Sequence, residues 1–315
     1  MYRHFLVPAG GTDAAIEAVG HALEFARSIG ARVTFFGACG LPGHAHGAAC
    51  STSRATEWLA KAEAAARAHG VPCGCVPTDA APTADRTLQA LVAMARAQGC
   101  DLLCVPADAH WLVRRPDASD ALTSCGMPVL MCMAQRHRTA DRVIGKLLDG
   151  HRASGAELHA LMDHTRAAVS RDASPDADTM RAATNALRNV LALRERPGRD
   201  ACMFSMLRER TSALDAELAE LERQYQQEIR LLVALIDSAS AVAAGQLPAA
   251  RFEQQLQACA QFIWECMGRE EGVVLPAARR YLSDADWRDI DAALGIAATP
   301  TNLEHTSREQ DSSRA

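Results

Sequence analysis

Residues 1–36 read MYRHFLVPAGGTDAAIEAVGHALEFARSIGARVTFF, and this stretch decides the fold of the first part of the chain. Two apolar runs, 3–8 and 32–37, enclose an alanine-rich stretch at 13–29. Gly30 follows that stretch at the place where a helix normally ends with a glycine cap. Short apolar runs joined by a helix predict two parallel strands with a right-handed crossover between them.

The same alternation continues to about residue 133. We expect further strands at 72–77, 101–105 and 128–133, and helices at 53–69, 83–98 and about 117–124. Strands alternating with helices predict an α/β fold with a doubly wound, parallel, five-stranded sheet. Ligands of such sheets bind beyond the carboxyl ends of the strands. Those ends are predicted at 8–12, 38–51, 78–82 and 106–116.

After residue 136 the strand pattern stops and long helical stretches follow. We expect helices at 141–170, 178–194, 201–244 with a break near 211, and 249–281, and a short last helix that ends near 294. Four long helices with short links are typical of an all-α four-helix bundle. The sequence therefore predicts an α/β domain at 1–136, a bundle at 140–296, and a disordered polar tail at 297–315.

The composition argues against two kinds of partner. The 315 residues carry a formal net charge of −5, without the basic excess that nucleic-acid binding requires. No apolar run reaches the roughly 18–20 residues that span a bilayer, and the start does not resemble a secretory signal. We expect a cytoplasmic protein with no nucleic-acid or membrane partner, whose 11 cysteines are thiols or ligands.

The first part of the chain resembles the universal stress protein family. The resemblance rests on residues 1–36, GCDLLCVPAD and SCGMPVLMC, and covers about 1–134. Nucleotide-binding members have an aspartate where this chain has Gly10, and a glycine-rich phosphate loop where 107–116 has no glycine. The resemblance therefore implies loss of ATP binding, unless Arg114 and Arg115 hold phosphate by charge.

The same resemblance implies a homodimer. Members of the family often pair through the edge of the fifth strand, which corresponds to 128–133 here. Its sequence, PVLMCM, is apolar, and a bare apolar strand edge is an aggregation hazard.

The second part resembles the hemerythrin-like (HHE cation-binding) family. AELERQYQQEIRLLVALIDSA and QFIWECMGREEGVVLPAARRYLSDADWRDIDAAL carry the resemblance, which covers about 140–296. It implies a bundle that, in metal-binding members, holds two irons through histidines and carboxylates. Only His151 and Glu270 match ligand positions, and residues 165–304 contain no histidine. The other matching positions hold Glu195, Arg199, Tyr225 and Cys266.

We therefore expect a degenerate metal site. An unpaired buried carboxylate is costly, so Glu270 should bind Arg199 or, failing that, Arg196, with Tyr225 and Cys266 lining the former cavity. The alternative is that Glu270 reaches a wet crevice and pairs with nothing. No cofactor is expected, and iron or ATP would bind only if the degenerate motifs still function.

A loop after the second predicted strand offers a different ligand set. Cys39, His44, His46 and Cys50 suit tetrahedral zinc or a soft copper site, although their spacing is also that of an ordinary glycine-rich surface loop. No catalytic triad, P-loop or acid/base carboxylate pair stands out. The sequence favours a non-catalytic, cytoplasmic stress-response or regulatory protein. The alternatives are a metal or redox sensor that uses this loop or a residual bundle site, and a nucleotide-binding universal stress protein.

Overall fold

A computed structural model gives the structure of most of the chain. The described residues are 2–37, 52–76, 88–106, 108, 126–133, 136–170, 177–194 and 199–297. We call residues 2–133 the sheet part and residues 136–297 the helical part. None of the described helices combines the length and apolar character that crossing a bilayer requires.

The sheet part contains five parallel strands in the order β3-β2-β1-β4-β5. The predicted parallel five-stranded sheet is therefore confirmed. Its strands are β1 (His4–Ala9), β2 (Arg32–Gly37), β3 (Cys73–Cys75), β4 (Leu102–Pro106) and β5 (Val129–Cys132). In register, Phe5 of β1 lies between Val33 of β2 and Leu102 of β4. The third strand is shorter than expected, and the helix predicted near 117–124 lies outside the described residues.

Helices connect the strands as the sequence predicts. They are α1 (Asp13–Ile29), α2 (Thr52–His69) and α3 (Leu88–Ala97). The Thr12 hydroxyl accepts a hydrogen bond from the Ala15 N–H and caps the start of α1. Gly30 ends α1 in the left-handed conformation, with φ of 69°, which glycine adopts without steric cost.

The two faces of the sheet pack against different helices. Phe5 and Val7 face α1 and α2, whereas Leu6 and Phe36 face α3. This division follows from the alternation of side chains along a strand. Both faces are buried, as is usual for parallel sheets.

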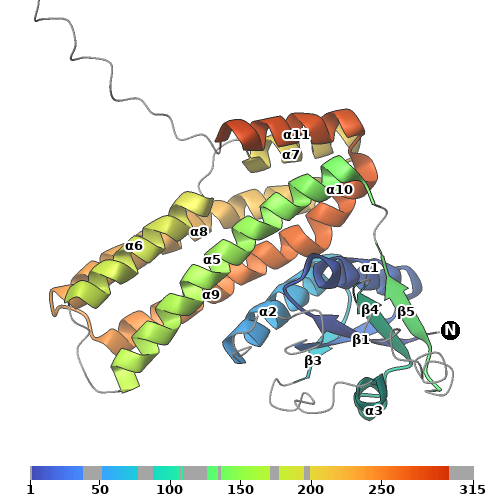
Figure 1. Cartoon of the computed structure of the whole chain (residues 1–315), viewed down its shortest axis with the longest axis horizontal. Coiled ribbons are helices and arrows are strands. Elements are labelled where there is room, and N and C mark those ends of the chain that lie inside the picture. Colours follow the sequence, from blue (N-terminus) through green and yellow to red (C-terminus); the bar gives the residue numbers. More distant parts are fainter. Residues whose placement is uncertain are drawn as a thin grey trace, which may run out of the picture.

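The helical part consists of long helices with a cluster of shorter ones at one end (Figure 1). The long helices are α5 (Arg138–Ser170), α6 (Ala177–Arg194), α8 (Asp215–Ala243) and α9 (Ala249–Arg269). A π-helical turn, η3 (Glu270–Val274), continues α9 into α10 (Leu275–Tyr281). The remaining helices are α7 (Arg199–Arg210) and α11 (Asp284–Ala297). Helix α5 packs against α6 and α9, and α8 packs against the same two helices.

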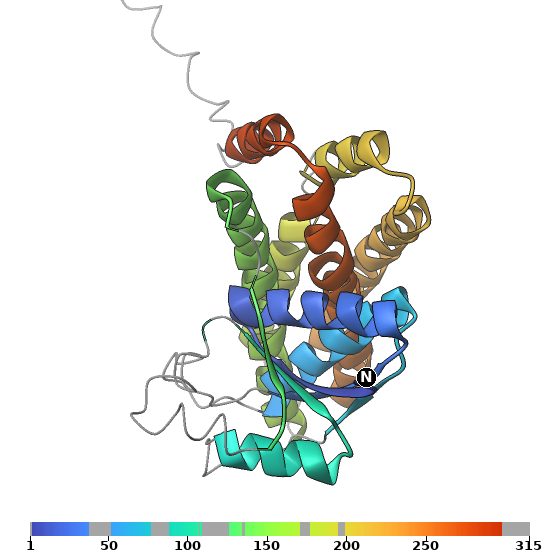
Figure 2. The same cartoon turned by 90° about the vertical axis from the view of Figure 1, so that its right-hand side faces the viewer.

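Helices α1 and α2 lie between the sheet and the helical part, as Figure 2 shows. Two glycines of the helical part allow α2 to come close. A Cβ atom on Gly268 would lie 2.2 Å from the Lys61 carbonyl oxygen, and one on Gly272 would lie 2.3 Å from the Ala65 Cβ. Ala60 of α2 belongs to an apolar core of the helical part. The sheet part is thus packed directly against α9 and η3.

Candidate functional site

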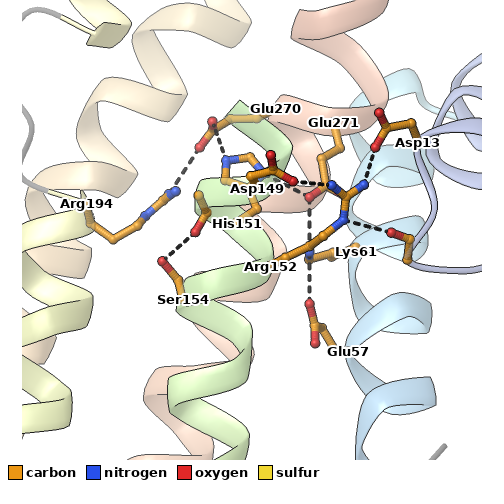
Figure 3. A network of polar contacts seen from close by, with 12 residues as sticks. Asp13, Glu57, Lys61, Asp149, His151, Arg152, Ser154, Arg194, Glu270 and Glu271 are labelled. Carbon is orange, nitrogen blue, oxygen red and sulfur yellow. Dashed lines mark hydrogen bonds and ion pairs between the residues drawn. The ribbon is translucent and has the colours of Figure 1, made fainter. Parts of the chain in front are cut away.

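A chain of buried charged side chains runs from the helical part into α2 (Figure 3). Its centre is His151 on α5, which lies between two successive carboxylates. The Nε2 atom of His151 is 3.1 Å from Glu270 Oε2, and its Nδ1 atom is 2.9 Å from Glu271 Oε1. All three side chains are almost completely buried.

The π-helical turn explains why two neighbouring glutamates both face inward. A π-helix bonds each N–H to the carbonyl five residues earlier, as Leu275 does to Glu270, so successive side chains diverge less than in an α-helix. Pro276 has no N–H to offer the carbonyl of Gly272. His69 of α2 lies at that carbonyl instead, with its Nε2 atom 2.9 Å from the oxygen. The contact from His69 therefore lets the sheet part stabilise the π-helical turn.

Both ring nitrogens of His151 meet carboxylate oxygens, which restricts where the protons are. An ionised carboxylate only accepts hydrogen bonds. The two contacts can therefore both be hydrogen bonds only if both ring nitrogens carry a proton or one carboxyl group is protonated. In either case His151, Glu270 and Glu271 together carry one proton more than they would if the imidazole were neutral and both carboxylates were ionised.

Arg194, the last residue of α6, supplies the cation on one side of this trio. Its Nη2 atom donates to Glu270 Oε1 at 3.1 Å, and its Nε atom donates to Glu228 Oε1 at 2.5 Å. The guanidinium also lies over the ring of Tyr225, 5.5 Å from its centre. Burial alone would lower the pKa of Arg194, but the Glu228 and Glu270 carboxylates raise it further than burial lowers it.

Lys61 of α2 supplies the cation on the other side. Its Nζ atom lies 3.0 Å from Glu271 Oε1 and 2.9 Å from Glu57 Oε1. Burial would lower the pKa of Lys61, but the two carboxylates raise it above its ordinary value. Burial likewise would raise the pKa of Glu57, yet Lys61 and His159 hold it at about 2. The ammonium and the carboxylates are therefore charged at neutral pH.

His159 ends the chain of contacts within α5. Its Nε2 atom is 2.7 Å from Glu57 Oε2, and its ring stacks on the indole of Trp264 with 5.2 Å between the ring centres. The full sequence of contacts is Glu228, Arg194, Glu270, His151, Glu271, Lys61, Glu57 and His159. Acidic and basic groups alternate along it, so each buried carboxylate lies beside at least one basic group.

A second contact between the two parts lies at the carboxyl end of β1. Arg152 of α5 donates from Nε to the Gly11 carbonyl at 3.0 Å and binds the carboxylate of Asp13 at the start of α1. A small pocket adjoins this contact, and its wall includes Gly10, Trp58 and Lys61. The helical part thus covers the edge of the sheet where a ligand of this fold class would bind.

The structure brings some of the residues selected from the sequence together, and others lie outside its described part. His151 and Glu270 do lie together. The guanidinium that binds Glu270 belongs to Arg194, which the sequence analysis did not select. Glu195 and Arg196 lie outside the described residues, and so does the side chain of Arg199. The ring of Tyr225 lies against the guanidinium of Arg194.

Cys266 is buried beside this cluster and lies 3.5 Å from the side-chain oxygen of Gln224. Burial, together with the Glu228 carboxylate, raises the pKa of its thiol, so the group is neutral. The other selected residues all lie outside the described part of the chain: Cys39, His44, His46, Cys50, Arg114 and Arg115.

The arrangement does not suit the pair of irons that the hemerythrin-like resemblance implies. Glu270 and Glu271 already bind Arg194, His151 and Lys61, so two permanently charged cations lie beside the carboxylates that a metal would need. Within the described residues, no group of three or more histidine, cysteine, aspartate or glutamate side chains could hold a metal ion.

Comparison with known proteins gave no assignment, because no family model and no curated protein matches this chain.

Proposed function

We propose that this chain is a non-catalytic stress-response or regulatory protein, built from a universal-stress-like domain at 1–136 and a hemerythrin-like four-helix bundle at 140–296. One observation carries the proposal: Arg194 and Lys61 provide positive groups for Glu270 and Glu271, and His151 lies between the two carboxylates within hydrogen-bond distance of both. Because side chains of the same protein bind these carboxylates, the cluster serves to stabilise the fold. The protein would then act through its surface, in the cytoplasm.

The Arg152 contact supports the same proposal for the sheet part. The position that matches the nucleotide-binding aspartate of universal stress proteins is Gly10, and Arg152 binds the carbonyl of the next residue. This contact supports the view that a side chain of the helical part takes the space that a nucleotide would need in the family. This favours a regulatory protein over a nucleotide-binding one.

The test is an analysis of the full-length protein purified from iron-replete cells. We expect iron far below one equivalent per chain and an ATP dissociation constant weaker than about 1 mM, or about 4 kcal/mol of binding. Two irons per chain, or micromolar ATP binding, would contradict the proposal. Stoichiometric zinc or copper that disappears in a Cys39→Ser variant would instead favour the metal-sensor alternative.

A homodimer through β5 belongs to the proposal. In the described sheet, β5 is an edge strand, and Leu130, Met131 and Met133 beside that edge are exposed. We expect a dimer in sedimentation, weakened by Leu130→Lys because a charge opposes edge pairing. Val233→Lys is the matched control, since Val233 is a similarly exposed apolar residue on α8. A monomeric wild-type protein at micromolar concentration would rule the dimer out.

A further inference from the structure

Two free cysteines lie side by side in the sheet part, on neighbouring strands. Cys104 is in β4 and Cys132 is the last residue of β5, and these two strands are hydrogen-bonded to each other. The register places Cys104 opposite Leu130, two residues before Cys132. Side chains two residues apart along a strand point to the same face of a sheet. Both cysteines therefore share one face, and both belong to the apolar core that packs against α1.

The two thiols interact directly. Cys104 donates a hydrogen bond to the sulfur of Cys132, and this bond raises the pKa of the Cys104 thiol and lowers the pKa of the Cys132 thiol. Burial acts in the opposite direction on Cys132, but the hydrogen bond outweighs it. The thiolate is the nucleophilic form of cysteine. Cys132 is therefore the more reactive sulfur of the pair, and Cys104 is the donor that stabilises its thiolate.

Cys132 lies in the part of the sheet that opens most easily. In the described sheet β5 is an edge strand, four residues long and hydrogen-bonded to β4 alone (Figure 1). The neighbours of Cys132 in the sequence, Met131 and Met133, are exposed, whereas Cys132 itself is 4% exposed. Local opening costs least at such peripheral elements and most in central strands. A small oxidant can thus reach Cys132 from the sheet edge while the rest of the core stays folded.

We propose that Cys104 and Cys132 are a reversible redox pair, which peroxides oxidise to a disulfide that links β5 to β4. The Cys132 sulfur attacks one oxygen of hydrogen peroxide, breaks the O–O bond and becomes a sulfenic acid, and the thiol proton leaves with the other oxygen as water. The Cys104 sulfur then attacks the Cys132 sulfur, and its proton leaves with the sulfenic hydroxyl as a second water. Two thiols and one peroxide thus give one disulfide and two waters.

The strand arrangement suits this bond after a small movement. A disulfide brings two sulfurs to about 2.05 Å and their Cα atoms to within about 7 Å. Two sulfurs that already share a hydrogen bond are close to this geometry, and the short edge strand supplies the remaining displacement. Leu130 and Met131, which are exposed on β5, move with the strand. The oxidation state of the pair therefore changes the apolar edge of the sheet.

The experiment treats the native full-length protein with hydrogen peroxide, blocks the remaining thiols and maps the disulfides by tandem mass spectrometry. We expect a Cys104–Cys132 disulfide that a thiol reductant reverses. In Cys104→Ser the hydroxyl still donates to Cys132, but no thiol completes the reaction, so Cys132 should accumulate as the sulfenic acid that dimedone traps. Cys259→Ser is the matched control, because Cys259 is also buried but lies on α9, and this variant should form the disulfide as the wild type does.

The rate of oxidation gives a second measurement. The hydrogen bond lowers the pKa of Cys132, whereas burial raises the pKa of Cys259 to about 12, so Cys132 should oxidise at least about 10-fold faster. Equal rates at these two cysteines would overturn the inference. So would a wild-type protein in which peroxide oxidises other cysteines and leaves this pair reduced. The wild-type mapping decides the matter even where a variant does not fold.

The inference goes beyond the proposed function and does not depend on it. The proposed function fails on iron or ATP binding, and the redox pair fails on the disulfide between Cys104 and Cys132. The two failures are therefore distinguishable in the same purified protein.

Discussion

The two lysines of this protein make the same kind of contact in opposite surroundings. Lys61 lies 3.0 Å from Glu271, and Lys146 lies 2.8 Å from Asp291. The side chain of Lys61 is 9% exposed, however, and that of Lys146 is 47% exposed. Water and salt screen the surface pair, whereas the buried pair has only its own partners to stabilise each charge. Although the distances are similar, loss of one partner should therefore destabilise the fold much more at Lys61 than at Lys146.

The largest effect is expected at Arg194. Arg194→Met removes the cation from Glu228 and Glu270 together, and leaving buried charges unpaired costs about 3–5 kcal/mol. Arg208→Met is the surface control, because Arg208 binds Glu222 through two hydrogen bonds at 2.9 and 2.8 Å but is exposed, and should cost less than about 1 kcal/mol. Urea unfolding of both variants measures the difference. Equal losses in the free energy of unfolding would mean that burial does not determine how much these ion pairs contribute to stability.

A smaller effect is expected where α2 touches Gly268. Gly268→Ala would place a methyl group 2.2 Å from the Lys61 backbone, and backbone cannot rotate away, so α2 must shift at a cost of about 1–3 kcal/mol. Gly145→Ala on α5 meets nothing within 4 Å and should be neutral or stabilising, because alanine favours helix. Thermal unfolding measures the difference: a lower melting temperature for Gly268→Ala than for Gly145→Ala shows that α2 packs closely against Gly268, and equal melting temperatures would contradict this.

A gentler change is expected on acidification. Lys61 and His159 hold the pKa of Glu57 at about 2, below the ordinary 4.5, so its stabilising contribution is complete above pH 4.5 and is lost as the pH falls toward 2. Glu57→Gln should flatten this part of the stability curve. Some slope remains in the variant, because Arg210 and Ser283 also lower the pKa of Asp286 to about 2. An unchanged slope in Glu57→Gln would show that Glu57 is not paired in the folded protein.

The elements of the fold were predictable because local patterns specify them. Gly30, Gly70 and Gly99, which follow the first three predicted helices, all have positive φ angles. The apolar runs before and after those helices form the parallel sheet. Such signals need no knowledge of distant residues.

The candidate site was only partly predictable because distant packing creates it. Leu221, Tyr225, Ile229 and Leu232 recur three or four residues apart, a spacing that predicts an inward stripe including Ile229. The structure instead buries Glu228 and leaves Ile229 half-exposed, because Arg194 offers a partner for the carboxylate. Glu57 and Lys61, four residues apart on α2, have the spacing of an ordinary surface ion pair. Only contact with η3, some 210 residues later in the chain, buries them.

The central claim is that Lys61 is an internal cation between the two parts of the molecule, and acylation of the native protein tests it directly. The sequence has only two lysines, so a brief treatment with an amine-reactive ester followed by peptide mass spectrometry reports on both in one sample. The account predicts that Lys146 is acylated while Lys61 reacts only after unfolding in urea. Acylation of Lys61 and Lys146 at similar rates in the native protein would contradict it.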